Sequence, residues 1–133
     1  MSLNRIAIIS VPVSDQAEAR DFYADTLGFQ VIRDHPMGPD RRWVQVGPEG
    51  AETSLTLVNW PDGMPAGSLR GLVMVSDDIE ADRDALAARG VDITEVGDTP
   101  WGRFAMFSDP DGNGWVLQEA RDGERAGAGT SDN

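Results

Sequence analysis

The sequence predicts an α+β fold built from two tandem βαβββ modules. Each half opens with a strand of alternating apolar residues, a helix-start signature follows it, and the second half repeats the first 62 residues later. The superposed pairs are Val13 with Val75, Asp15 with Asp77, Glu18 with Glu80, Gly28 with Gly90 and Leu55 with Leu117. A constant offset through the cap, the helix stop and the final strand indicates an internal duplication.

The first module is expected over residues 4–59. Apolar residues alternate along Arg5–Val13, which predicts a strand. Asp15 and Glu18 have the spacing of a capping box that starts a helix, and Gly28 ends that helix. Turn-rich segments at residues 35–40 and 47–50 then separate three predicted strands, at Phe29–Asp34, Arg42–Val46 and Thr53–Asn59.

The second module is expected over residues 68–120, after the Pro- and Gly-rich linker Trp60–Gly67. A strand at Leu69–Val75 leads to a helix that starts at Asp77–Glu80 and ends at Gly90. Three strands follow at Val91–Val96, Arg103–Ser108 and Gly114–Glu119, the last two joined by the turn Asp109–Asn113. Residues 121–133 show no apolar period, so we expect a disordered tail.

The composition excludes several kinds of site. The chain has 11 Arg and no Lys against 23 acidic residues, a net charge of −12, with one His and no Cys. It can form no disulfide, thiolate-ligated zinc or thiol nucleophile, and one chain cannot supply a three-His zinc site. A pI near 4.2 disfavours nucleic acid and anionic membranes as partners. With no apolar run long enough to cross a bilayer, we expect a cytoplasmic protein.

The duplicated modules resemble the vicinal oxygen chelate superfamily of glyoxalase I, bleomycin-resistance proteins, fosfomycin-resistance enzymes and extradiol dioxygenases. The resemblance covers residues 4–120 and rests on Val13-Ser-Asp15, Phe22-Tyr23, Leu27-Gly28-Phe29 and Asp109-Pro-Asp-Gly-Asn113. It implies one domain over residues 1–120 whose mixed sheet curves around a cavity, and a homodimer. The motifs are specific for the fold and poorly specific for the function.

The resemblance also locates the positions where glyoxalase-like relatives bind metal. They lie on the first and last strand of each module, and spacing carries them to Ile8, Ser54, Arg70 and Val116. None of the four is His or Glu. The sequence therefore predicts no metal and no cofactor, and the metal-polarised chemistry of these relatives is not expected.

The alternation of the strands predicts which residues face the cavity. The helices need apolar partners, which are expected to be Ala7, Ile9, Val11, Leu55, Leu57, Val73, Val75 and Leu117. The opposite faces then carry Ile6, Ile8, Ser10, Ser54, Thr56, Val58, Ser68, Arg70, Leu72, Met74, Val116 and Gln118. A mostly apolar face with a few polar groups and one cation is typical of a small-molecule pocket.

Individual residues allow two interpretations each. Arg70 either clamps a ligand carboxylate or phosphate, or pairs with a carboxylate of this acidic chain. Ser54, Thr56 and Gln118 either orient a ligand or are merely tolerated on a strand. Trp43 and Trp101 are candidate pocket walls, whereas Trp115 is expected in the core. His35 is either a general base or lone metal ligand, or an exposed loop residue.

Together these features predict a metal-independent, homodimeric binding protein of the glyoxalase/bleomycin-resistance type. It would sequester an anionic or aromatic drug or metabolite, with Arg70, Ser54, Thr56, Gln118, Trp43 and Trp101 as contacts. The alternative is a glyoxalase-I-like lyase, isomerase or dioxygenase that uses a displaced metal site at His35 or metal-free acid–base catalysis. The sequence leaves open whether the protein is an enzyme.

Overall fold

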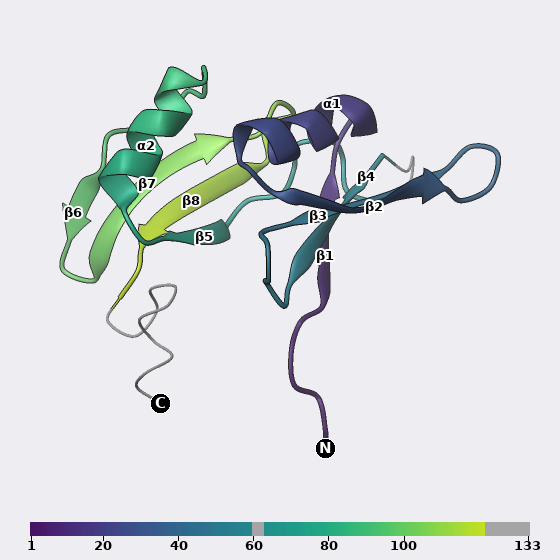
Figure 1. Ribbon diagram of the computed structural model, residues 1–133, viewed down its shortest axis with the longest axis horizontal. Coiled ribbons are helices and arrows are strands. Elements are labelled where there is room, and N and C mark those ends of the chain that lie inside the picture. Colours follow the sequence, from purple (N-terminus) through teal and green to yellow (C-terminus); the bar gives the residue numbers. More distant parts are fainter. Residues whose placement is uncertain (60–62, 122–133) are drawn as a thin grey trace. The chain divides into compact units, whose positions relative to one another are not determined.

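The structure, a computed structural model, describes residues 1–59 and 63–121. These divide into two compact units, the first comprising residues 1–69 with 109–113 and the second residues 70–108 with those from 114 onward. Each unit pairs one four-stranded mixed sheet with one helical segment (Figure 1). The predicted α+β class and the βαβββ order of both modules are confirmed. The predicted tail lies outside the described residues except for Arg121.

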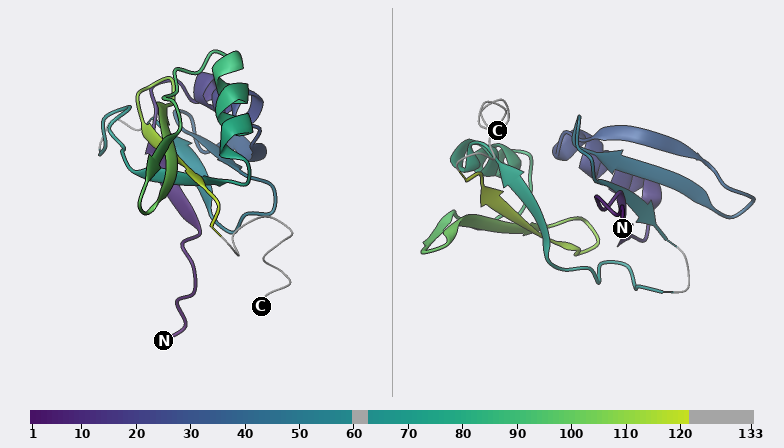
Figure 2. Two further views of the ribbon diagram at one scale, coloured as in Figure 1. Left: turned by 90° about the vertical axis from the view of Figure 1, so that its left-hand side faces the viewer. Right: turned by 90° about the horizontal axis from the view of Figure 1, so that it is seen from below.

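The sheet of the first unit has the strand order β1-β4-β3-β2, in which β1 and β4 are parallel and the other pairs antiparallel. The β2–β3 hairpin extends beyond the part of β3 that pairs with β4 (Figure 2). The bounds are β1 Ile8–Pro12, α1 Gln16–Asp21, the π-helical turn η1 Phe22–Thr26, β2 Gln30–Pro36, β3 Arg42–Gly47 and β4 Ser54–Val58.

The first helix begins and ends where the sequence predicts. The Asp15 carboxylate accepts a hydrogen bond from the Glu18 amide at 3.0 Å, and Gly28 takes a positive φ of 80° after the last turn. That last turn is wider than an α-helix, since the Leu27 amide donates to the Phe22 carbonyl five residues back.

The second unit contains a sheet of order β5-β8-β7-β6, with β5 and β8 parallel. The bounds are β5 Leu72–Ser76, α2 Ile79–Ala88, β6 Gly97–Thr99, β7 Gly102–Ser108 and β8 Gly114–Glu119. Asp78 caps α2, one residue later than the duplication predicts. The predicted strand at Val91–Val96 is wrong. There the Met106 amide donates a hydrogen bond to the Thr94 hydroxyl oxygen instead of to a backbone carbonyl. This interrupts the backbone hydrogen bonding between the strands, so strand β6 begins only at Gly97.

The predicted faces of the first strand of this unit are also wrong. Val73 is paired with Val116, whereas Leu72 and Met74 lie opposite Trp115 and Leu117, both buried. Val73 and Val75, expected to face the helix, are instead 53% and 45% exposed. The pairing of β5 with β8 is shifted by three residues from that of β1 with β4, because Val116 pairs with Val73 and not with Arg70. A shift by an odd number of residues exchanges the two faces of a strand.

The core of the first unit includes a buried polar network. The Tyr23 hydroxyl donates to Asp109 Oδ2 at 2.8 Å, and Asn113 Nδ2 donates to the same oxygen at 2.8 Å. Asn113 Nδ2 also donates to the Pro12 carbonyl, and the Leu69 amide donates to Asn113 Oδ1. The turn Asp109–Asn113 therefore satisfies buried groups of the first unit besides joining β7 to β8.

We expect Asp109→Asn to destabilise the fold by about 2 kcal/mol or more, because an amide group would face donors that now point at a buried carboxylate. Asp111→Asn is the matched control, since it makes the same charge change in the same turn but affects an exposed contact with Ser14. Its cost should stay below about 1 kcal/mol. Urea unfolding measures both values, and equal losses would contradict a special role for Asp109.

Candidate functional site

The first sheet has two chemically different faces. Asp34 on β2 lies opposite Val44 on β3 and binds Arg20 of α1, which identifies the helix side of the sheet. The side away from α1 is called here the polar face. The cross-strand pairs assign to it Ser10, Arg33, His35, Trp43, Gln45, Ser54 and Thr56.

A chain of side-chain hydrogen bonds runs across the polar face. Trp43 Nε1 donates to Gln45 Oε1 at 3.0 Å, and Gln45 Nε2 donates to Ser54 Oγ at 2.7 Å. The Thr56 hydroxyl donates to the Val44 carbonyl at 3.2 Å. Gln45, Ser54 and Thr56 are buried and Trp43 is half-buried, so the chain holds the indole in one orientation.

The structure brings three of the predicted contact residues together here, namely Trp43, Ser54 and Thr56. Sequence reasoning missed Gln45, although its place between Val44 and Val46 was the signal that could have revealed it. An amide between two buried valines on a strand must point to the other face of the sheet and find partners there.

A β-bulge in β2 decides which charged side chains reach the polar face. Val31 lies opposite Val46 and Arg33 lies opposite Gln45, so Ile32 is an extra residue in β2. Without it, alternation would direct Arg33 toward α1 and Asp34 to the polar face. With it, Asp34 turns to the helix while Arg33 and His35 join Trp43. His35, whose segment was predicted to be turn-rich, is instead an exposed residue of β2 opposite Trp43.

An ion-pair cluster on the helix side holds β2 in this register. The Asp34 carboxylate contacts Arg20 Nη1 of α1 at 2.6 Å and Arg42 Nε of β3. The hydrogen bond from Arg20, with the one from Arg42, holds the pKa of Asp34 below its usual value, and the same contact raises the pKa of Arg20. The side chain of Asp34 is only 17% exposed, so bulk solvent screens the cluster only in part.

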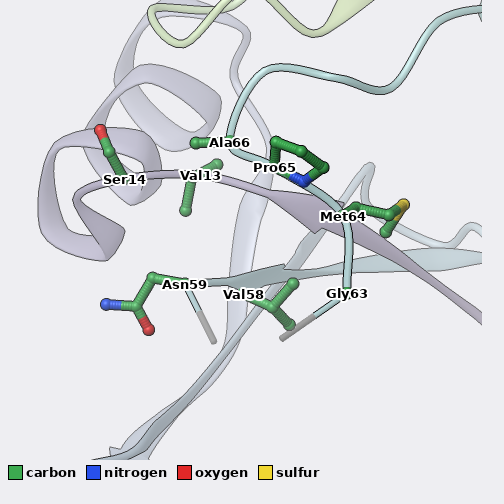
Figure 3. Close-up of a pocket in the computed structure, with 8 residues that line it drawn as sticks. All are labelled: Val13, Ser14, Val58, Asn59, Gly63, Met64, Pro65 and Ala66. Atoms are coloured by element: carbon green, nitrogen blue, oxygen red, sulfur yellow. The ribbon is translucent and has the colours of Figure 1, made fainter. Parts of the chain in front are cut away.

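A pocket of about 350 Å³ opens at the carboxyl ends of β1 and β4. Val58, one of the residues predicted to face a cavity, lies with Asn59 across from Met64–Ala66 (Figure 3). The remaining lining residues are Val13, Ser14 and Gly63. None of these side chains carries a charge, so the pocket offers shape and neutral hydrogen-bonding groups.

The second unit holds the other predicted contacts. Gln118 shares a sheet face with Val116, Val73 and Val75, and Trp101 between β6 and β7 is 70% exposed. Arg70 precedes β5 and is exposed, so its predicted place on a strand beside Val116 is wrong. Its side chain lies so close to Gly114 that a Cβ there would come within 2.9 Å of Arg70 Cδ.

The prediction that Trp115 belongs to the core is confirmed. It is 5% exposed and stacks on Phe107, with ring centroids 6.3 Å apart.

The residues present do not fit the family's metal site. Ile8 and Ser54 are cross-strand neighbours, as the predicted ligand positions require, but in the second unit the neighbour of Val116 is Val73 rather than Arg70. The four positions thus hold three aliphatic side chains and one hydroxyl, which are poor ligands for a divalent cation. Within residues 1–59 and 63–121, no three His, Asp or Glu side chains are grouped so as to hold a metal ion.

The described helices include none that is long and apolar enough to cross a membrane.

The sequence model of the Glyoxalase/Bleomycin resistance protein/Dioxygenase superfamily matches residues 3–117. The chain belongs to this superfamily. Superfamily membership confirms the resemblance inferred from the motifs, and the match covers nearly all of the residues that the structure describes.

Solved structures and curated relatives agree with this assignment. The chain is similar to TnmS3, an antibiotic binding protein from Streptomyces sp. CB03234, with 51% identity, a TM-score of 0.86 and coverage of 91% of this chain and 99% of that one. A superfamily member from Sphaerobacter thermophilus shows 36% identity and a TM-score of 0.83, covering 90% of this chain and all of the other. YetH of Bacillus subtilis is 36% identical over 121 residues, which span 88% of this chain and 99% of YetH.

The lowered pKa of Asp34 predicts a pH-dependent contribution to stability. The pKa of the Asp34 carboxyl is lower in the folded state than in the unfolded state, where it is about 4. Such a group stabilises the fold at pH values above its unfolded-state pKa, and the stabilisation is lost as the pH falls through its folded-state pKa. Asp34→Asn should therefore cost about 1 kcal/mol at pH 7 and less at pH 3. Denaturant unfolding at both pH values measures this, with Asp21→Asn as the control because Asp21 is mostly exposed. A cost that does not change with pH would contradict it.

Proposed function

We propose that this protein is a metal-independent small-molecule-binding protein that sequesters an antibiotic or metabolite at the polar face of its first sheet. The observation that carries the proposal is the buried chain from Trp43 through Gln45 to Ser54, which fixes an aromatic ring beside oriented polar groups. Similarity to the antibiotic binding protein TnmS3 over nearly the whole chain supports a ligand of this kind.

The proposed site works by preorganisation. Trp43 offers a ring that its hydrogen bond to Gln45 already holds in place, so a flat ligand can stack without first ordering the indole. Ser54 and Thr56 lie on the same face, where hydrogen bonds to Gln45 and to the Val44 carbonyl hold them, and their direct contact with a ligand remains a prediction. The expected contacts Gln118, Trp101 and Arg70 of the second unit remain predictions.

The absence of suitable side chains at the four ligand positions supports metal independence. Val73 and Val116 would present hydrocarbon where relatives present metal ligands, and a hydrophobic side chain there favours a ligand's apolar portion.

The homodimer that the resemblance implies remains a prediction. A second copy of the chain would cover an exposed apolar surface on the second sheet. This surface consists of Val73, Val75 and Met106, which are 53%, 45% and 57% exposed.

A second candidate function rests on His35. The bulge places this imidazole on the polar face beside Trp43, where it could accept a proton from a bound substrate without a metal. In that case, His35→Gln would abolish turnover and leave binding intact. We favour binding without chemistry, because the ring of His35 contacts the Pro36 carbonyl, and no carboxylate or hydroxyl of residues 1–59 or 63–121 hydrogen-bonds to it and orients it.

The neutral fluorescent probe N-phenyl-1-naphthylamine tests the proposed site. We expect the protein, after dialysis against EDTA, to bind the probe and to transfer tryptophan excitation to it. Trp43→Ala should weaken this binding at least roughly fivefold, the effect of losing about 1 kcal/mol of aromatic contact. Adding zinc, nickel or manganese should leave the affinity unchanged.

Val31→Ala is the matched control for that substitution. It removes an exposed apolar side chain from the same sheet but on the side of α1, so probe affinity should not change. Binding that appears only after metal is restored would overturn metal independence. Equal affinities for the Trp43 and Val31 variants would overturn the placement of the site on the polar face.

A further inference from the structure

We propose that Arg33 is the anion-recognising residue of the polar face, so that the ligand carries an acidic group beside a flat ring. The acidic group can be a carboxylate, a sulfonate or an ionised phenol, each of which presents oxygens that a guanidinium can bind. This inference deepens the proposed function and rests on it.

The bulge in β2 is the first observation behind the proposal. The extra residue Ile32 shifts the register, so Arg33 lies opposite Gln45 instead of facing α1. Bulges commonly redirect a side chain next to a functional site. Here one inserted residue brings a cation to the polar face and removes the neighbouring carboxylate, Asp34, from it.

The second observation is the set of ion pairs. Arg20, Arg42, Arg83 and Arg103 each contact at least one carboxylate. Arg33 forms no ion pair with a carboxylate of residues 1–59 or 63–121, and its nearest acidic neighbour in sequence is occupied by Arg20 and Arg42 on the other side of the sheet. In a chain of net charge −12, an exposed arginine without such a partner is available to a ligand.

The third observation is the spacing of the neighbouring groups. Arg33 and His35 are alternate residues of one strand, so their side chains emerge about 7 Å apart on the same face. Directly across from them are Gln45 and Trp43. An acidic group bound at Arg33 would thus extend its ring toward the indole of Trp43, a distance that suits an aromatic acid.

A pair of probes that differ by one acidic group isolates this interaction. The neutral probe N-phenyl-1-naphthylamine and its sulfonate analogue 8-anilino-1-naphthalenesulfonate share the same naphthyl and phenyl groups. We expect Arg33→Gln to weaken the sulfonate roughly tenfold, the effect of one lost charge-assisted contact, while leaving the neutral probe unaffected. Arg33→Lys should recover part of the sulfonate affinity because it restores the charge but not the planar fork.

Arg89→Gln is the matched control, since it makes the same charge change at the exposed end of α2 in the second unit. Its sulfonate affinity should equal that of the unmodified protein. If Arg33→Gln and Arg89→Gln weaken the sulfonate equally, the effect is that of net charge and the assignment of Arg33 is wrong. Equal loss of both probes in Arg33→Gln would also overturn it. If the unmodified protein binds neither probe, the proposed function itself fails, and this inference fails with it.

Discussion

The Asp109 carboxylate is the constraint on which the first unit depends most. It is 5% exposed and accepts hydrogen bonds from the Tyr23 hydroxyl, the Asn113 amide group and the backbone amides of Asp111 and Asn113. A buried charge is tolerable only when its oxygens are satisfied in this way. Asn113 extends the network to Pro12 at the end of β1 and to the Leu69 amide, so one turn orders the helix, the first strand and the segment that follows the linker.

A second cluster, around Asp34, determines which side chains lie on the polar face of the first sheet. Asp34 is held on the helix side by Arg20 and Arg42, and this is compatible with the sheet only if Ile32 bulges out of the β2–β3 ladder. The ion pairs and the bulge therefore support each other. Their consequence appears on the opposite face, where Arg33 and His35 stand beside the Trp43 ring. The ion pairs of Asp34 on the helix side of the sheet thus decide which charged side chains lie on the polar face.

The sequence predicted the fold well because its signals are local. The Asp15 cap, the Gly28 stop and a strand within Arg5–Val13 each depend on residues a few positions apart, and all three were confirmed, although the strand is shorter than predicted and Ala7 is exposed. The site was predicted less well because it depends on register. A register shift of three residues between β5 and β8 reversed the faces of β5 and left Arg70 before the strand, and one extra residue in β2 brought Arg33 to the polar face. Neither shift breaks an apolar pattern strongly enough to be read from one sequence.

The four strand positions where the resemblance places metal ligands carry few polar groups in this chain. In this chain Ile8, Val73 and Val116 offer hydrocarbon, and Ser54 already accepts a hydrogen bond from Gln45. The groups that the proposed function assigns to recognition lie further out in the first sheet, on β3 and on the edge strand β2. The Trp43 ring is held by Gln45, and the bulge at Ile32 directs Arg33 to the same face. Both groups are in place before a ligand arrives, which suits binding better than catalysis. Under the proposed function, recognition would therefore depend on β2 and β3 of the first sheet rather than on the four positions where the resemblance places metal ligands.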